Sequence, residues 1–232
     1  MPHINLPPGH SPGISGLLMY REETAKPLRE LVEILLLGPS TLSPGEREII
    51  ASSVSWWNDC HFCHTSHGAA ACAHLDRDAE FIDAIKAGLP NEPLSPKMRA
   101  LLHVAHQVQR GGKHVTDDDV AKARAAGATD VEIHDTVLIA ASFCMFNRYV
   151  DGLGTWAWPE KEKFMEIGRK MAKGYMEPYV PGRELGGERV AAGRTGKPRN
   201  FVFLAVHRCC VLRVAGKATT GSMGRLSNDS SF

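Results

Sequence analysis

Several features that mark whole classes of protein are missing from this chain. Its 232 residues contain no run of 18 apolar residues, so no membrane-spanning helix is expected. The N-terminus has no basic segment followed by an apolar run, so no signal peptide is expected. The formal net charge is only +1, which gives no reason to expect binding to nucleic acid or to a membrane surface. Together these absences favour a cytoplasmic protein.

Residues 1–181 also lack any sustained alternation of polar and apolar residues, the pattern of a half-buried strand. Ser-Pro pairs, capping-box patterns and glycines instead divide this part into helices. The sequence predicts an all-α domain of eight helices, over about 25–37, 44–57, 60–74, 77–87, 96–110, 117–126, 130–150 and 160–173. The helix at 130–150 is apolar around nearly its whole circumference, which predicts a place at the centre of the domain or at a subunit interface.

Residues 182–232 differ from the rest of the chain in net charge and in amino-acid composition. They hold nine Lys/Arg and three Asp/Glu, a net charge of +6, which leaves residues 1–181 at −5. The segment is rich in Gly, Arg and Ser, with a β-prone run at Phe201–Val206. We predict an atypical basic tail that is not part of the helical core.

Two of the six cysteines, Cys60 and Cys63, form a CxxC pair, and His67 lies four residues beyond the second. On a helix, these three side chains lie on one face. Such a dithiol can cycle between thiol and disulfide, and an imidazole beside it can take the thiol proton. Glu48, near the start of the preceding helix, can orient or reprotonate His67 if the fold brings the two helices together.

The residue pattern leaves open which thiol is the more acidic. Turn residues at 58–59 predict that Cys60 lies in the first turn of a helix, where free backbone N–H groups favour a thiolate. Cys63 lies one turn further and has His67 as its base, although His64 stands in the same relation to Cys60. His64 and Trp57 are also candidates for lining a substrate pocket, beside the more ordinary interpretation of Trp57 as a packing residue.

Two alternative interpretations of the CxxC pair involve a metal or haem. A structural zinc site needs four ligands, and His64 and His67 would have to complete it from the same helix, which rarely wraps a tetrahedral ion. Residues 60–64 also read C-x-x-C-H, the haem c attachment pattern, but that modification normally requires export. We therefore expect neither a metal nor an organic cofactor.

The motif with its neighbours resembles a known family. Glu48, Cys60, Cys63 and His67, at their spacing, resemble the signature of the alkylhydroperoxidase D-like (AhpD-like) proteins of the carboxymuconolactone decarboxylase-like superfamily. The flanking sequence at residues 55–70 is similar to the peroxidase-related branch, and the resemblance extends from about Leu6 to Tyr179. The decarboxylase branch lacks the CxxC pair.

This resemblance implies an all-helical AhpD-like fold that assembles into homo-oligomers, either trimers or hexamers. It implies that Cys63 attacks peroxide, that Cys60 resolves the product into a disulfide, and that Glu48 and His67 relay protons. The implied partners are a hydroperoxide and an external dithiol or thioredoxin-like reductant. The expected function is thus a thiol-dependent peroxidase or disulfide reductase. The alternative is a non-catalytic redox sensor or scaffold whose disulfide controls assembly.

Overall fold

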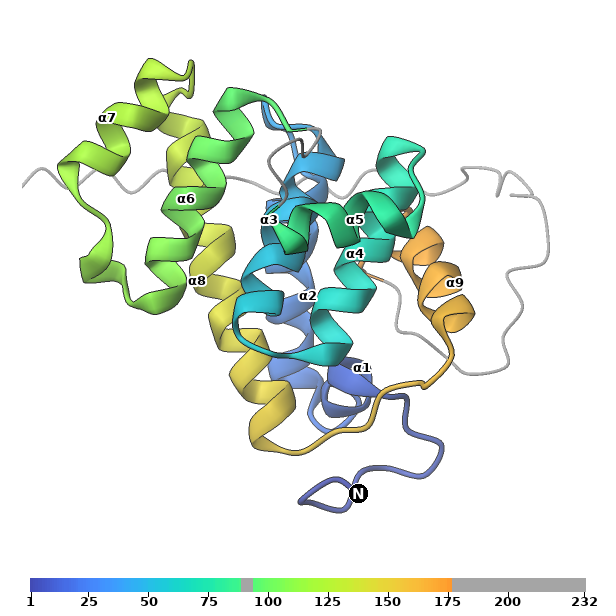
Figure 1. Cartoon of the computed structure of the whole chain (residues 1–232). Coiled ribbons are helices and arrows are strands. Elements are labelled where there is room, and N and C mark those ends of the chain that lie inside the picture. Colours follow the sequence, from blue (N-terminus) through green and yellow to red (C-terminus); the bar gives the residue numbers. More distant parts are fainter. Residues whose placement is uncertain (89–93, 177–232) are drawn as a thin grey trace, which may run out of the picture. The chain divides into compact units, whose positions relative to one another are not determined.

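The computed structural model describes residues 1–88 and 94–176, and this part of the chain is all-α (Figure 1). It contains no strand in the described residues. The helices are α1 (Gly13–Leu18), α2 (Glu22–Leu37), α3 (Pro44–Trp57), α4 (His61–Leu75), α5 (Ala79–Ala87), α6 (Pro96–Arg110), α7 (Asp117–Ala125), α8 (Asp130–Gly152) and α9 (Lys161–Met171), with a short 3-10 helix, η1 (Gly112–His114).

The eight helices predicted from the sequence correspond to α2–α9, which confirms the all-α class. Helix α2 begins at Glu22, three residues before the predicted start, and includes Pro27. Helix α1 was not predicted, because a helix of six residues with two glycines is too short to show a helical period in the sequence. The predicted boundary at residue 181, the basic tail and the Phe201–Val206 run lie outside the described residues, so that division stays a prediction.

Several helix starts are fixed by the side chains that the sequence predicted as caps. The hydroxyl groups of Ser43, Ser95, Thr116 and Thr129 each accept a hydrogen bond from a backbone N–H in the first turn. Three of these starts are capping boxes, in which the third residue of the helix bonds back to the cap. Local chemistry therefore sets where these helices begin.

Helices α3 and α4 pack against each other at the centre of the bundle (Figure 1). Helices α6 and α8 pack on α3, and α7 packs against the far part of α6. Helix α9 packs on α4, where Gly168 permits close contact: a Cβ there would lie 2.4 Å from the backbone carbon of Ala69. This arrangement leaves α4, with its dithiol, between α3 and α9.

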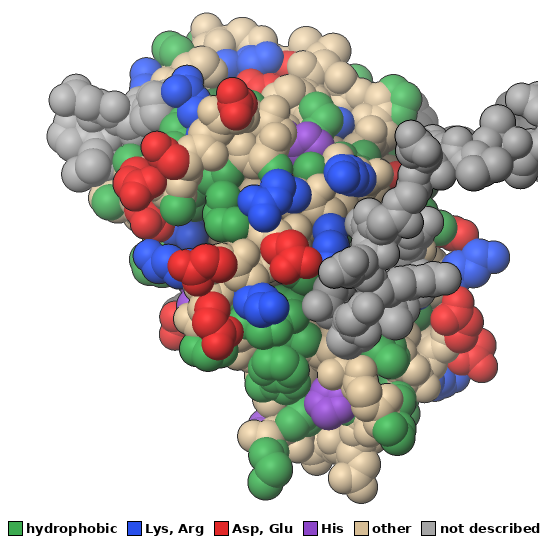
Figure 2. Space-filling model, turned by 90° about the vertical axis from the view of Figure 1, so that its right-hand side faces the viewer, with side chains coloured by type: hydrophobic (Ala, Val, Ile, Leu, Met, Phe, Trp, Pro, Cys, Tyr) green, Lys and Arg blue, Asp and Glu red, His purple; other side chains and the backbone are tan. Residues whose placement is uncertain are grey.

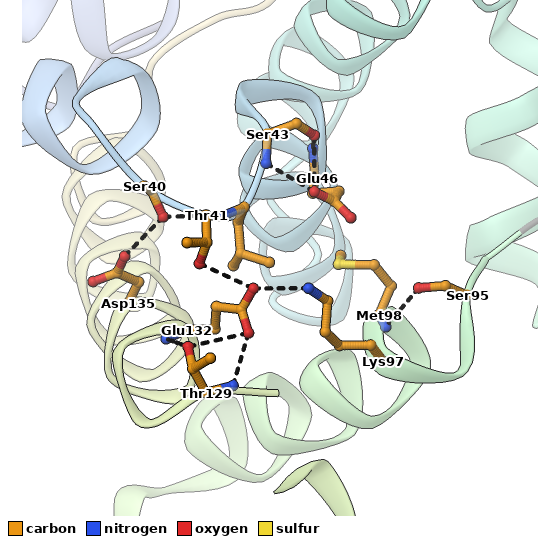
Figure 3. Close-up of polar contacts among 11 residues, drawn as sticks. Ser40, Thr41, Ser43, Glu46, Ser95, Lys97, Met98, Thr129, Glu132 and Asp135 are labelled. Atoms are coloured by element: carbon orange, nitrogen blue, oxygen red, sulfur yellow. Dashed lines mark hydrogen bonds and ion pairs between the residues drawn. The ribbon is translucent and has the colours of Figure 1, made fainter. Parts of the chain in front are cut away.

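Glu132, near the start of α8, joins three elements through its buried carboxylate (Figure 3). It accepts hydrogen bonds from Lys97 Nζ of α6 at 2.7 Å, from Thr41 Oγ1 at 3.0 Å, and from the backbone N–H of Thr129 at 2.8 Å. Burial alone would raise the pKa of Glu132, but these donors outweigh it and lower the pKa to about 2. The ionised carboxylate therefore stabilises the junction of α6, α8 and the loop before α3.

We expect Glu132→Gln to lower the free energy of unfolding by about 2 kcal/mol at neutral pH, the usual worth of hydrogen bonds to a charged group. Because the folded state lowers the pKa, this contribution is present above the ordinary glutamate pKa and is lost as the pH falls toward 2. Urea unfolding at several pH values measures it. The control is Glu166→Gln, which removes an exposed i,i+4 pair with Lys170 and should change little. A difference between wild type and Glu132→Gln that persisted at pH 2 would contradict this account.

The composition of α8 predicted a place either at the centre of the domain or at a subunit interface. Within one chain the helix is not buried on all sides, so the central placement is wrong. Val131, Leu138 and Met145 are 61%, 37% and 44% exposed. At spacings of seven residues they share one face of the helix. The opposite face holds Ile139, Phe143 and other core residues. The subunit-interface interpretation of this helix therefore remains a proposal.

The surface shows no division into acidic and basic regions on the face drawn in Figure 2, where side chains of both signs are interspersed. None of the helices in the described part of the chain is both long enough and apolar enough to cross a lipid bilayer.

Candidate active site

The dithiol lies at the N-terminal end of α4, and this helix begins one residue later than predicted. Cys60 is the N-cap residue, and α4 itself begins at His61. Asp59 makes the turn with φ 57°, in the left-handed region, and the backbone N–H of Cys60 bonds to Ser55 at 3.0 Å. The prediction that Cys60 would lie inside the first turn was wrong. Cys60 instead directly precedes the first turn of α4, and Cys63 is the third residue of that turn.

Asn58 does not cap α4, because its side chain is used elsewhere. Its amide donates to Asn147 Oδ1 of α8 at 2.8 Å and accepts from Gln109 of α6 at 3.0 Å. Asn147 in turn donates to Ser55 Oγ at 3.0 Å. This chain of amides holds the turn before the dithiol against α6 and α8, which fixes where the thiols lie.

The two thiols form a close pair and are both buried, with Cys60 0% and Cys63 3% exposed. Their side chains are hydrogen-bonded to each other. That bond and burial raise the pKa of Cys60, whereas the backbone N–H of Cys63 opposes the rise. Cys60 therefore keeps its proton beside Cys63.

Apolar side chains surround the pair and form a cluster separate from the main core. Its buried members, apart from the thiols, are Leu17, Phe62, Ala69, Val150 and Phe164, from α1, α4, α8 and α9. Gly13 explains how α1 reaches this cluster. Its φ is +60°, and a Cβ there would overlap the ring of Phe62, with 2.2 Å to the nearest ring carbon. The thiols thus lie in surroundings of low polarity.

Glu48 of α3 and His67 of α4 meet, because α3 packs against α4. Glu48 is fully buried, and its Oε2 lies 2.7 Å from His67 Nδ1. The edge of the His67 ring packs against Phe143, with 4.6 Å between ring centroids. His67 lies one helical turn beyond Cys63. Because Glu48 engages Nδ1 of the ring, Nε2 is the ring nitrogen that Glu48 leaves available. The packing of α3 on α4 therefore assembles a carboxylate, an imidazole and a dithiol in one region.

Two polar side chains that sequence reasoning missed also reach this region. The Tyr175 hydroxyl, from the segment after α9, donates a hydrogen bond to Glu48 Oε1. The carboxyl group of Asp151, in the last turn of α8, hydrogen-bonds to the Cys60 side chain. Burial raises the pKa of Asp151, the hydrogen bond to Cys60 opposes the rise, and the nearby charge of Asp59 adds a smaller increase. Neither residue stands at a helical spacing from the CxxC motif, so only the fold could reveal them.

His64 and Trp57, the two pocket candidates, lie in different surroundings. His64 accepts a hydrogen bond at Nδ1 from Lys86 Nζ at 3.0 Å, and its ring meets Trp56 edge-on at 5.0 Å. Burial, together with the charge of Lys86, lowers the pKa of His64 to about 3, so the ring stays neutral. Trp57 instead packs on His106 of α6 at 4.6 Å, against the main core.

The four described cysteines, including Cys72 and Cys144, are all free thiols. Among residues 1–88 and 94–176, no group of three or more His, Cys, Asp or Glu side chains is arranged to hold a metal ion. The arrangement around the dithiol therefore has the elements of thiol redox chemistry: two adjacent sulfurs, a base with an orienting carboxylate, and a water-poor surrounding.

Comparison with known proteins agrees with this geometry. Residues 22–90 match the carboxymuconolactone decarboxylase family. The chain resembles an uncharacterized peroxidase-related protein from Silicibacter sp. TM1040, at 26% identity and a TM-score of 0.60, over 68% of this chain and 81% of that one. It also resembles a structure described as "alkylhydroperoxidase AhpD core: uncharacterized peroxidase-related protein", from Ralstonia eutropha JMP134, at 26% identity and a TM-score of 0.61, over 70% and 83%. No curated protein matches the chain. The match across α2–α5 and the structural likeness show an AhpD-like helical fold in which residues 22–90 match the carboxymuconolactone decarboxylase family.

Proposed function

We propose that this protein is a thiol-dependent peroxidase of the alkylhydroperoxidase kind, working in a reducing compartment such as the cytosol. The observation that carries the proposal is the close Cys60–Cys63 pair on the same helix as His67, whose Nδ1 is bonded to the buried Glu48. The printed descriptions of the two similar structures, both peroxidase-related, support the same reaction class.

The first step transfers one oxygen from the peroxide to Cys63. His67 takes the thiol proton at Nε2, and the Cys63 thiolate attacks the O–O bond of ROOH. The S–O bond forms as the O–O bond breaks, which gives a sulfenic acid and an alkoxide. The imidazolium of His67, held by Glu48, returns its proton to the alkoxide, and ROH leaves. The choice of Cys63 as the nucleophile rests on His67, which lies one helical turn beyond it on α4.

The second step resolves the sulfenic acid. Cys60 sulfur attacks the Cys63 sulfur, its proton joins the leaving hydroxide, and water is released with the Cys60–Cys63 disulfide. An external dithiol or a thioredoxin-like protein then reduces the disulfide by exchange, which restores both thiols. The close approach of the two sulfurs in the reduced protein favours this ring closure.

A steady-state assay tests this proposal. With excess tert-butyl hydroperoxide and a dithiol or thioredoxin system, we expect many equivalents of peroxide consumed per chain, well above the rate with reductant alone. Oxidation of one equivalent followed by arrest, with every reductant tried, would contradict a peroxidase.

That arrest would favour the second candidate, a redox sensor whose disulfide alters assembly. The observation in its favour is the exposed apolar face of α8, formed by Val131, Leu138 and Met145, which would suit contact with a second copy. Both candidates are expected to form homo-oligomers. Sedimentation of the reduced and the oxidised protein separates them, since only a sensor should change its oligomeric state with its redox state.

A further inference from the structure

Tyr175 comes to the site from outside the CxxC motif and contacts both members of the Glu48–His67 pair. Its hydroxyl donates to Glu48 Oε1, and its ring lies parallel to the His67 ring, with an interplanar angle of 12° and 6.0 Å between centroids. Its backbone N–H donates to Glu33 Oε2 of α2 at 2.6 Å. The segment after α9 is thereby tied to α2, and Tyr175 is held over the pair.

The Tyr175 hydroxyl acts as a donor to Glu48. Burial raises the pKa of Tyr175 well above its ordinary value, and the carboxylates of Glu48 and Glu33 raise it further. The phenol therefore keeps its proton throughout the working pH range. Glu48 then receives a hydrogen bond at Oε1 whatever the state of its other oxygen.

A donor at one oxygen favours the ionised form of the Glu48 carboxylate, because hydrogen bonds to a charged acceptor are the stronger ones. An ionised Glu48 must accept at Oε2 as well, so the proton in the Glu48–His67 bond belongs to Nδ1. That leaves Nε2 of His67 without a proton and able to act as a base. With Glu48 protonated, the opposite arrangement becomes possible: the carboxyl donates to Nδ1, and Nε2 carries the proton.

We propose that Tyr175 is a positioning residue that keeps Glu48 an acceptor and thereby fixes the His67 tautomer with its proton on Nδ1. The catalytic meaning of this role rests on the proposed peroxidase function, whereas the tautomer itself does not. Tyr175 acts through Glu48 and His67 and has no direct part in the sulfur chemistry.

Two other charged groups, Arg47 and Glu33, lie near the Glu48–Tyr175 contact and bear on what a pH experiment reports. Arg47, the neighbour of Glu48 on α3, is buried, and its charge interacts with Glu48. Glu33 of α2 faces Tyr175 rather than His67. A variant that lacks only the Tyr175 hydroxyl keeps Arg47 and Glu33, so their charges are the same in the variant and the wild type.

The test is Tyr175→Phe in the full-length chain, which removes the hydroxyl and keeps the ring over His67. We expect kcat/KM for the hydroperoxide to fall roughly 10- to 100-fold, the usual worth of one hydrogen bond to a charged group. The acid limb of the pH profile should move to higher pH, because the carboxylate without its donor takes up a proton more readily. The matched control is Tyr149→Phe, which removes a hydroxyl beside the dithiol cluster that contacts Leu17 rather than Glu48. It should leave the acid limb where it is.

A second measurement is independent of peroxide turnover. Nitrogen-15 NMR of histidine-labelled protein distinguishes the two tautomers, and comparison with His67→Gln identifies the His67 signals among the eleven histidines. We expect Nδ1 protonated and Nε2 bare in the wild type, with the Nε2-protonated form growing in Tyr175→Phe as the pH falls. An unchanged tautomer and an unchanged acid limb in Tyr175→Phe would overturn the inference, as would a wild-type His67 protonated at Nε2. If the wild type has no turnover but the tautomer shifts as described, the peroxidase proposal fails and the role of Tyr175 stands.

Discussion

Replacing Cys63 with serine should abolish peroxide turnover and leave no sulfenic acid to trap. The reason lies in the first step: the only thiol with His67 one helical turn away supplies the electrons that break the O–O bond. The measurement is steady-state peroxide consumption, together with labelling by a dimedone-type probe and mass spectrometry of the labelled peptide.

The matched variant, Cys60→Ser, should also stop turnover, but for a different reason. Without the resolving thiol, a sulfenic acid is stranded at Cys63, where the probe should label it after one equivalent of peroxide. The two variants share the same helix end and remove one sulfur each, so differences in folding do not explain the contrast. A sulfenic acid found at Cys60 in Cys63→Ser would mean that the roles of the two cysteines are reversed.

Glu48→Gln and His67→Ala should slow turnover by about 10²- to 10⁴-fold without removing the dithiol, as is usual for general acid–base groups. In Glu48→Gln, an amide N–H can face His67 Nδ1, which then accepts, so Nε2 carries the proton and cannot serve as a base. Alkylation followed by mass spectrometry should still find both Cys60 and Cys63 as free thiols in both variants. Loss of rate with an intact dithiol is the expected signature.

Two controls lie on the same helices. Glu46→Gln changes a carboxylate of α3 whose partner is the cap residue Ser43, and a glutamine can still complete that capping box. His74→Ala removes another imidazole from α4, one whose Nε2 has no hydrogen-bond partner in the structure. Both should stay near the wild-type rate. A rate in Glu48→Gln equal to that of Glu46→Gln would remove Glu48 from the mechanism.

Much of the local structure follows from short-range chemistry that can be read along the chain. Thr129 and Glu132 are three residues apart, and their reciprocal hydrogen bonds need nothing beyond the first turn of α8. The relation of Cys63 to His67 is equally local, since both lie on α4. For this reason the predicted helices and the faces of the motif agree with the structure.

Register errors arose where a tertiary contact competed with a local one. Asn58 is a good cap by its chemistry, but its side chain is hydrogen-bonded to Gln109 of α6 and Asn147 of α8, and Cys60 takes the N-cap position instead. Helix α1 forms because its Gly13 fits against Phe62 and its Leu17 packs in the dithiol cluster. No local sequence pattern predicts these contacts. Apolar composition likewise could not show that α8 would keep one face exposed.

The sequence by itself determined the helical class, the helix starts and the presence of a dithiol with a base one turn away, because these depend on residues within a few positions of each other. The tertiary structure alone decided which groups complete the site. Packing of α3 on α4 joined Glu48 to His67, and the return of the segment after α9 brought Tyr175 to a carboxylate 127 residues earlier in the chain. Such contacts depend on helix packing angles and on burial, which many distant side chains set together, so no spacing along the chain encodes them.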